Sequence, residues 1–503
     1  MAGENMKMNT QQTLLATVLA PLALALAPVA GAKVTGIGGN DGSTVPAVAP
    51  ASCTAPSARA FDLTARAGHI TLGDGNSLYV WGYSTDAEAT PESGVMQYPG
   101  PTMIVCEGDT VTVTLHNQLP DNVSIAFPGQ AGVTTGAGAP GLLTNEVLKY
   151  AVGAVPTPPT PVTYTFVASR PGTFQYQSAT QPEVQMEMGL VGALIVRPQG
   201  FDNVAYGTYG VAAAARRAYA STASGYDVEY MFFESEMDRA VHEAMSEAVR
   251  DPAIARPNFA NLKQTLWFLN GRNGPDTMIE VNAAWLPNQP YNALAQMHPG
   301  DRLLMRIIGA GRDLHPFHHH GNNAWVIARD GRVLESVPNS AVAYPDYVGI
   351  SDLVSRNATL PNQAVSNFTI QTNPGSTYDA LFTWTGRGLN WDVYANRPGH
   401  VPGAGCTAAT RLPFEDPASH CQVFPVALPE QQSLTFGGLW SGSQYLGQVD
   451  PLPPLQGGLN PQGGFSFMWH SHTERELTND DIFPGGMMTM LIVQAADSGA
   501  TIE

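Results

Sequence analysis

Apolar and polar residues alternate in short runs along most of the chain, which is the pattern of β-strands. Val111, Val113 and Leu115 alternate with threonines directly after the turn Glu107-Gly108-Asp109. Because successive side chains of a strand point to opposite faces, this run predicts a strand with one buried face. The same reasoning predicts strands over residues 162–168, 173–178 and 190–196. Short strands separated by turn residues indicate a β-sandwich in this part of the chain.

A second group of strands begins after residue 226. It comprises residues 265–269, 301–308, 325–328, 378–384, 465–472 and 487–493. The run 301–308 follows Pro299-Gly300 much as the first strand follows Gly108-Asp109, which suggests an internal repeat of one sandwich. Two helices are predicted, one in the alanine-rich residues 211–220 and one over residues 236–250, which begin acidic and end in arginine as the helix dipole favours. Residues 387–464 predict a long, loop-rich insertion.

These patterns divide the chain into two β domains, residues 61–200 and residues 226–503, joined by a linker over residues 201–225. Residues 33–60 are rich in Gly, Ala, Pro and Ser and predict a flexible tail. Residues 1–32 predict an export signal, because Lys7 precedes an apolar run that ends near the small residues Ala30-Gly31-Ala32. We therefore expect a secreted or periplasmic protein without a transmembrane segment.

Charge and cysteine content narrow the partners and the compartment. The formal net charge is -18, which argues against a nucleic-acid partner because phosphate binding needs a basic surface. Small molecules and metal cations are compatible with this charge. The four cysteines favour two disulfides in an exported chain, with three pairings possible. Proximity in sequence favours Cys406–Cys421, which leaves Cys53–Cys106.

Six of the 12 histidines lie in two short tracts about 150 residues apart. The first tract contains His315, His318 and His320, and the second contains His470 and His472. In a strand, residues two apart face the same way, so each His-x-His presents two imidazoles on one side. If the two strands lie side by side, four imidazoles converge. Imidazole is a ligand of copper, zinc, iron and nickel, so the tracts predict a metal site.

Several motifs together resemble those of multicopper oxidases. They are Pro99-Gly100-Pro101-Thr102, Glu107-Gly108-Asp109-Thr110-Val111, the tract from His315 to Gly321, and Trp469-His470-Ser471-His472 followed by Gly485-Gly486-Met487-Met488. The resemblance implies an all-β fold with two cupredoxin-like Greek-key β-sandwich or barrel domains, the second enlarged by insertions, and few short helices. It also implies bound copper and an oxidoreductase that uses dioxygen to oxidise small reductants or metal ions.

In the family, a type 1 copper is held by two histidines and a cysteine, and eight further histidines in four His-x-His motifs hold a trinuclear cluster. The first two motifs have lost their ligands here. Ala126 and Pro128 stand in the first pair of histidine slots, and Gln177 and Ala179 in the second. Alanine and proline side chains have no lone pair for a metal, and glutamine is a poor copper ligand. Alignment with two-domain nitrite reductases places Ser178 in a cysteine slot, so it restores no copper site.

The resemblance assigns the surviving ligands to the second domain. His318, His320, His470 and His472 occupy trinuclear-cluster slots, and His315 occupies a type 1 slot. Ser471 replaces the type 1 cysteine, and Glu476 replaces the second type 1 histidine. A hydroxyl cannot replace a thiolate in a blue copper site. We therefore expect copper of type 2 or type 3 and no type 1 copper. Related two-domain proteins form trimers, so the resemblance also implies a homo-oligomer.

An acidic run follows the second histidine tract and suggests a substrate. Its members are Glu474, Glu476, Asp480 and Asp481. Carboxylates suit hard cations, so they could present Mn(II) or Fe(II) to the copper; the alternative is a solvated loop. Two functions stay open at this point: an exported oxidoreductase of the multicopper-oxidase type, and a catalytically degenerate cupredoxin that serves as a structural or metal-binding module.

Overall fold

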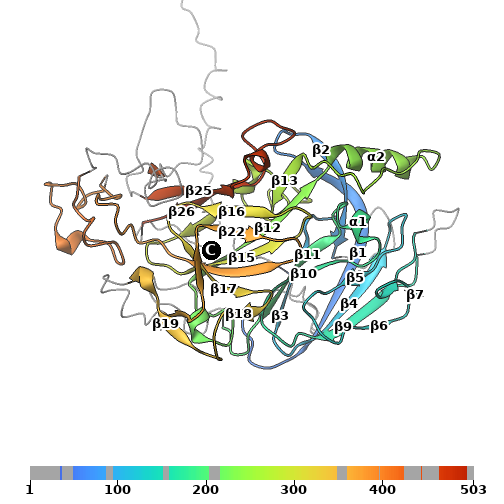
Figure 1. Cartoon of the computed structure of the whole chain (residues 1–503), viewed down its shortest axis with the longest axis horizontal. Helices are drawn as coiled ribbons and strands as arrows, with labels where there is room; N and C mark the ends of the chain where they lie inside the picture. The colour runs from blue at the N-terminus through green and yellow to red at the C-terminus, as the bar shows by residue number, and fades with distance from the viewer. Residues whose placement is uncertain are drawn as a thin grey trace, which may run out of the picture.

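The computed structural model describes most of the chain between residues 49 and 495 (Figure 1). The described residues are 34, 36, 49–85, 95–150, 158–202, 216–347, 359–395, 397–423, 443–444 and 464–495. The predicted export signal, the beginning of the predicted tail and much of the predicted linker lie outside them. Among the described residues, strands dominate, and none of the helices has the length and apolar character to span a bilayer.

Two sheets form the first half of the structure. The five-stranded sheet has the order β2-β1-β4-β9-β6, and the four-stranded sheet has the order β3-β11-β10-β5. The strands are β1 (Ala58–Thr71), β2 (Ser77–Ser84), β3 (Gly100–Cys106), β4 (Thr110–Asn117), β5 (Ile125–Ala126), β6 (Thr134–Gly136), β9 (Val162–Val167), β10 (Gly172–Ser178) and β11 (Val191–Arg197), with a separate pair β7 (Ala139–Pro140) and β8 (Asn145–Glu146). Alternate residues of β4, such as Val111 and Val113, are buried, as the period of two predicts.

Two larger sheets form the second half. One has the order β13-β12-β15-β23-β17-β18 with β21 paired to β17, and the other has the order β14-β26-β25-β16-β22 with β24 paired to β25. The strands are β12 (Val228–Met237), β13 (Leu266–Leu269), β14 (Ala295–Met297), β15 (Leu303–Gly309), β16 (His315–His319), β17 (Ala324–Arg329), β18 (Arg332–Val333), β21 (Val365–Asn367), β22 (Thr369–Thr372), β23 (Thr377–Phe382), β24 (Ser443–Gln444), β25 (Phe465–Ser471) and β26 (Met488–Val493), with a separate pair β19 (Ala341–Ala343) and β20 (Thr359–Pro361).

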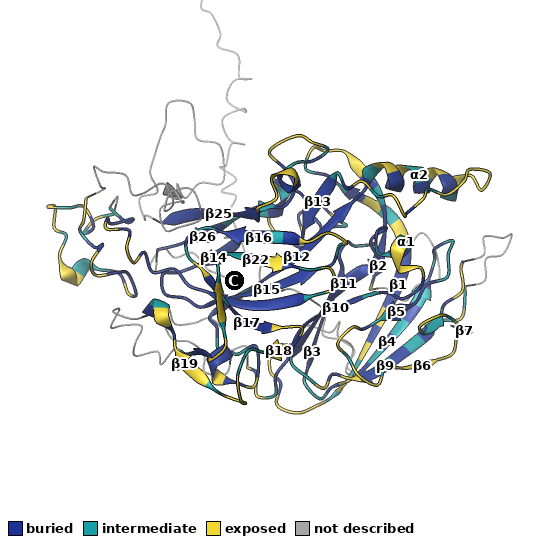
Figure 2. Cartoon of the chain, viewed as in Figure 1, coloured by how far each residue is buried: buried dark blue, intermediate teal, exposed yellow. Residues whose placement is uncertain are grey.

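Each half has an apolar core between its two sheets, so each is a β-sandwich. In the second half, Phe232 of β12 contacts Phe317 of β16 and Trp469 of β25, with ring centroids 4.9 and 5.7 Å apart. Burying such aromatic rings is a major source of stability. Figure 2 shows β12, β15, β16 and β25 as almost wholly buried. The predicted all-β fold is confirmed.

The two sandwiches share a third apolar cluster. It joins strands β2, β3 and β11 of the first half to strands β12 and β13 of the second, for example Ile195 to Met231 and Phe233. A hydrogen bond from the Tyr98 hydroxyl to Ser235 Oγ, 2.7 Å long, crosses the same boundary. A buried apolar interface of this kind holds the halves in a fixed relation.

Helices are few. The described residues contain α1 (Pro182–Gln185), α2 (Arg239–Arg250) and the 3-10 turns η1 (Thr222–Ser224), η2 (Asp276–Met278), η3 (Pro345–Tyr347), η4 (Ala408–Thr410) and η5 (Glu474–Leu477). The helix predicted over 236–250 begins at Arg239, because Asp238 caps it by accepting from the Val241 N–H, and Glu236 stays in β12. The helix predicted over 211–220 is wrong in its described part: residues 216–220 form a bridge and bends, and Arg217 pairs with Gly225.

Both predicted disulfides are present. Cys53–Cys106 attaches the segment before β1 to the end of β3, so this part of the predicted tail is anchored. Cys406–Cys421 closes a loop within the insertion that follows β23. The described residues 387–395 and 397–423 of this insertion contain turns and one 3-10 helix, as the loop-rich composition predicts.

Candidate metal centre

Two neighbouring strands bring the histidine tracts together. β16 and β25 pair antiparallel, in a register that places His318 opposite His470. The strand pairing is visible at the top of the second sandwich in Figure 1. Because alternate residues share a face, His320 and His472 lie on the same side as this pair, while His319 points into the core and contacts Phe382.

The four imidazoles form one cluster. Ring centroids of His318 lie 4.8 Å from His320, 5.3 Å from His470 and 4.8 Å from His472. The Nε2 atoms of His320 and His470 lie 3.2 Å apart, and one ligand nitrogen from each of His318, His320 and His470 lies within 4.8 Å of the other two. His318 and His470 are buried, whereas His472 is exposed, so the cluster opens on one side.

The outer nitrogens of two rings are fixed by neighbours. Nδ1 of His470 donates to the Ser471 carbonyl at 2.6 Å, which leaves Nε2 as the lone-pair nitrogen of the neutral ring. Nδ1 of His318 contacts Thr369 Oγ1 at 2.8 Å, and its buried Nε2 has no hydrogen-bond partner among the described residues. Burial and the neighbouring imidazoles lower the pKa of His318 to about 3, and burial lowers that of His470 to about 4. Both rings are therefore neutral at pH 7, as metal binding requires.

His315 lies in a different environment from the other four histidines. Its Nε2 contacts Glu236 Oε2 at 2.8 Å, and its Nδ1 contacts Glu476 Oε2 at 3.0 Å. Carboxylate oxygens only accept, so both ring nitrogens carry protons. Burial alone would lower the pKa of His315, but the hydrogen bonds to Glu236 and Glu476 outweigh it and raise the pKa well above 6.5. Predicted as a metal ligand, His315 is instead an imidazolium held between two carboxylates.

The same network contains Ser471 and a third glutamate. Ser471 Oγ donates to Glu476 Oε2 at 2.5 Å. Glu234 lies nearby in β12 and is fully buried, with the charge of His315 and the side chain of Thr372 as its favourable neighbours. Burial raises the pKa of Glu234 to about 8, partly offset by the charge of His315, so this carboxyl is protonated at neutral pH.

A cavity of about 420 Å³ reaches this network from the boundary between the sandwiches. Its lining includes Tyr98 and Glu187 from the first half and Ser235, Glu236 and Arg312 from the second. Burial raises the pKa of Glu187 to about 7, and the hydrogen bond that Glu187 accepts from the Asp238 N–H lowers it only in part. Three glutamates, Glu183, Glu187 and Glu236, therefore line this cavity, and Glu236 is the partner of His315.

The acidic run after β25 is divided by the structure. Glu476 turns inward to His315 and Ser471, and Asp480 pairs with Arg239 of α2. Glu474 and Asp481 are exposed. The four carboxylates therefore do not form one cation-binding surface; among them Glu474 is the one whose negative charge acts on His470, where it raises the pKa.

Comparison with known proteins finds a similarity to one family in part of the chain. Residues 95–200 match the family model described as multicopper oxidase. A 106-residue stretch is 31% identical to Laccase 1 of Metarhizium robertsii and covers 21% of this chain and 16% of that protein. Multicopper oxidase MCE of Talaromyces pinophilus is 31% identical over 105 residues, which cover 20% of this chain and 16% of that protein. Over these residues the chain is similar to multicopper oxidases, and it spans less than a fifth of the length of either relative.

The solved structures that match this chain are more distant in sequence. Blue Copper Oxidase from Nitrosomonas europaea is 17% identical, with a TM-score of 0.46, and the match covers 86% of each chain. Copper nitrite reductase from the same organism is 16% identical, with a TM-score of 0.37, and covers 65% of this chain and 85% of that one. The sequence matches to the two fungal proteins span 16% of their length, so their activities are not transferred to this chain.

The multicopper oxidase positions of the first domain carry no ligand pair. β10 and β5 pair in a register that places Gln177 opposite Ala126, which is the counterpart of His470 opposite His318 in the second domain. Pro128 is exposed, and Ser178 Oγ donates to Gln185 Oε1 at 2.6 Å. The strand framework of a copper site is thus kept in the first domain, while its metal-binding side chains are replaced.

Copper, which the family implies, fits the second-domain cluster. The buried Nε2 of His318, which has no hydrogen-bond partner among the described residues, lies among three further imidazoles, and leaving such a polar atom unpaired costs free energy. Neutral imidazole is also a preferred copper ligand. In the type 1 position the residues do not fit: His315 and Ser471 both hydrogen-bond to Glu476 Oε2, and Ser471 stands in place of a thiolate ligand.

Sequence reasoning missed four carboxylates and two histidines that the structure brings into clusters. Glu234 and Glu236 are polar residues on a strand whose neighbours are apolar and buried, which was a detectable signal. A second group lies in the insertion, where Asp392, His400, Glu415 and His420 meet. These four residues have no common spacing, so no sequence pattern marked them.

Proposed function

We propose that this protein is an oxidoreductase of the multicopper-oxidase type whose copper is held by His318, His320, His470 and His472. The observation that supports this most strongly is the cross-strand register that places three further imidazoles around the unpaired Nε2 of His318. Copper bound there would supply one-electron exchange between a reductant and dioxygen. The centre belongs to the type 2 or type 3 class, and there is no type 1 copper.

Without a type 1 site, copper held by these histidines would take electrons directly from the reductant. The exposed imidazole of His472 marks the side from which a small reductant reaches the cluster. Glu474, exposed at the start of η5, places a negative charge near His470 on this side. We propose a metal cation such as Mn(II), or a small organic reductant, as the substrate, with Glu474 as the residue that attracts a cation.

The buried network next to the cluster holds protons that reduction of dioxygen consumes. Hydrogen bonds run from Glu236, which lines the cavity, through His315 to Glu476 and Ser471. Ser471 lies between His470 and His472 in sequence, so the network ends at the strand that carries two of the ligands. In this proposal Glu236 receives protons from the cavity and His315 stores one between the two carboxylates.

The proposal includes export and self-association. Two disulfides are typical of proteins that fold in an oxidising compartment, which supports a secreted or periplasmic location. Four histidines are half the ligand set of a trinuclear cluster. We propose a homo-oligomer, which the resemblance to two-domain relatives suggests is a trimer. In such an oligomer, the open side of one histidine cluster would lie against a second copy of the chain.

The decisive experiment measures copper content, electron paramagnetic resonance and oxygen uptake of the purified protein. We expect bound copper without an intense blue absorption, and oxygen uptake that depends on Mn(II) or on a phenolic reductant. His472→Ala should lose this uptake, whereas the matched exposed variant His69→Ala should keep it. Glu474→Gln should raise the KM for Mn(II) and leave that for a neutral phenol unchanged. Protein that stays copper-free in excess copper would refute the proposal.

A second function is a metal-binding or structural module without turnover. The loss of all four first-domain ligands and of the type 1 thiolate favours it, because a complete electron path is absent from one chain. In that case copper binds to the wild type and is lost from His472→Ala, but no reductant supports oxygen uptake above that of free copper.

A further inference from the structure

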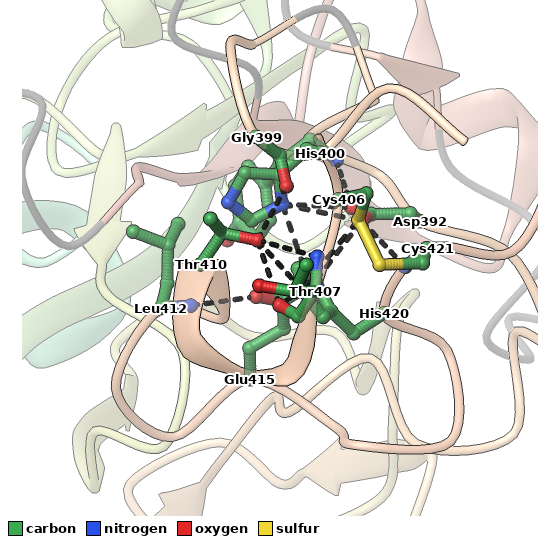
Figure 3. Close-up of a disulfide and its surroundings, with 11 residues drawn as sticks. Asp392, Gly399, His400, Cys406, Thr407, Thr410, Leu412, Glu415, His420 and Cys421 are labelled. Carbon is green, nitrogen blue, oxygen red and sulfur yellow. Dashed lines mark hydrogen bonds and ion pairs between the residues drawn. A yellow bond between two sulfur atoms is a disulfide. The ribbon is translucent and has the colours of Figure 1, made fainter. Parts of the chain in front are cut away.

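The insertion between β23 and β25 contains a second convergence of metal-ligating side chains. Asp392, His400, Glu415 and His420 come from separate turns of the insertion and meet beside the Cys406–Cys421 disulfide (Figure 3). Their exposed fractions are 1%, 2%, 5% and 6%, so solvent scarcely reaches them. The cluster is distinct from the histidine centre and uses none of its residues.

The four distances between the histidine nitrogens and the carboxylate oxygens are close to the edges of a tetrahedral metal site, and all four ligand atoms lie within 4.8 Å of one another. His400 Nδ1 lies 3.1 Å from Asp392 Oδ2 and 3.8 Å from Glu415 Oε1. His420 Nδ1 lies 3.2 Å from the same Asp392 oxygen and 3.3 Å from the same Glu415 oxygen. With metal–ligand bonds of about 2.0–2.1 Å, the edges of a tetrahedron are roughly 3.3–3.4 Å. The four distances scatter around this value, and each residue contributes a single atom.

Charge and hydrogen bonding favour a cation in this space. His420 Nε2 donates to the Thr407 carbonyl at 2.9 Å, so in a neutral ring Nδ1 is a lone-pair nitrogen facing two carboxylate oxygens, which also only accept. Two buried carboxylates without a compensating positive charge are costly. A divalent ion balances their charge and binds all four lone pairs.

The surrounding backbone already holds the ligands in place. Asp392 accepts N–H groups from Cys421 at 3.0 Å and from Tyr394 at 2.9 Å. Glu415 accepts the Leu412 N–H at 2.9 Å through its other oxygen. The disulfide joins the residue next to His420 to the opposite side of the loop. Outer hydrogen bonds of this kind orient metal ligands.

We propose that Asp392, His400, Glu415 and His420 bind a Zn²⁺ ion that holds the insertion in its folded shape. Two imidazole nitrogens and two carboxylate oxygens are a ligand set for zinc, and four protein ligands leave no open position for a substrate. The site is therefore structural. It stabilises a segment that has little regular secondary structure of its own, where the free energy of metal binding becomes free energy of folding.

The test is zinc content of the full-length protein after dialysis against Zn²⁺ and then against metal-free buffer, with copper measured in the same sample. We expect one zinc per chain in the wild type and in His472→Ala, and at least a tenfold loss of zinc in His400→Gln/His420→Gln. The matched control His69→Gln/His116→Gln should keep its zinc. Zinc retained by His400→Gln/His420→Gln, or absent from the wild type, would overturn the proposal and leave a metal-free ion-pair cluster.

A second measurement on the wild type does not depend on the variants folding. Limited proteolysis with peptide mapping compares protein stripped by a chelator with the same protein after zinc is restored. We expect cleavages between residues 392 and 423 to become at least tenfold slower when zinc is present. Equal cleavage of this segment with and without zinc would overturn the proposal, and neither experiment involves oxidase activity.

Discussion

Glu234 is the buried carboxyl group whose replacement gives the sharpest test of the network around His315. Burial raises its pKa from 4.5 to about 8. Between these two pH values the folded protein keeps a proton that the unfolded chain has released. Stability therefore falls as the pH rises through this window, and the loss is complete above the folded pKa. Glu234→Gln removes the ionisable group and should abolish this part of the pH dependence.

The magnitude follows from the width of the window. Each pH unit within it costs about 1.4 kcal/mol of unfolding free energy, and pH 7 lies about 2.5 units above the unfolded pKa. Glu234→Gln should therefore be more stable than the wild type by on the order of 3 kcal/mol at neutral pH, and equal to it near pH 4.5. This sign is unusual, because most substitutions of buried residues destabilise.

Denaturant titrations followed by tryptophan fluorescence between about pH 5 and about pH 8 measure the difference. Trp267 and Trp469 are buried in the second sandwich and report on its unfolding. The exposed variant Glu474→Gln is the control and should stay within about 0.5 kcal/mol of the wild type. Stability curves of Glu234→Gln and wild type that run parallel across this pH range would refute the assignment of a buried, protonated carboxyl.

Four further predictions follow from the centre and its neighbours. Ser471→Cys/Glu476→His should gain an intense thiolate-to-copper absorption on addition of Cu²⁺, because Nδ1 of His315 then faces a thiolate and a second imidazole. Glu476→His alone should show no such absorption, and a colourless double variant would contradict the geometry. The pKa values of His318 and His470 are about 3 and about 4, so both rings are already neutral at pH 5 and have no proton to lose when copper binds. Copper binding at pH 5 should therefore release at most about two protons from the four histidines, measured by calorimetry in buffers of different ionisation enthalpy. Release of four protons would contradict the neutral state of these two rings. Phe317→Ala should lower the free energy of unfolding by about 3–5 kcal/mol in denaturant titrations, because its buried ring packs against Phe232 and Trp469, and a loss below about 1 kcal/mol would contradict that packing. A Cβ added at Gly311 would lie 1.7 Å from Glu236 Oε2, so Gly311→Ala should displace this carboxylate and destabilise the protein. An unchanged His315 NMR titration in Gly311→Ala would contradict the contact.

The sequence was sufficient for the features that depend on local periodicity. The alternation of residues 111–115 specified a strand with one buried face, and the same period of two specified that His318 shares a face with His320 and His470 with His472. The two histidine tracts meet only if their strands pair, and the expectation that they pair came from the resemblance to multicopper oxidases. The missing type 1 cysteine was also plain from Ser471, because a residue type can be read without a structure.

Local patterns failed where two elements compete for the same residues. Glu236 was assigned to a helix because it begins an acidic and helix-favouring run, but it pairs with Trp267 across strands β12 and β13. Asp238 then begins the helix two residues later as its cap. Likewise, Glu476 looked like part of a solvated acidic loop, since charge patterning cannot show which carboxylate in a run turns inward.

The sequence by itself predicted the main strands, favoured the two disulfide pairings that the structure has, and determined the four imidazoles on two strand faces and the loss of the thiolate. Only the tertiary structure decided that His315 lies between Glu236 and Glu476, which are 79 and 161 residues away in the chain. The same holds for the two histidines and two carboxylates of the insertion, which meet through irregular turns. The physical reason is that backbone periodicity fixes only the direction of a side chain, whereas its partner is fixed by the packing of distant segments.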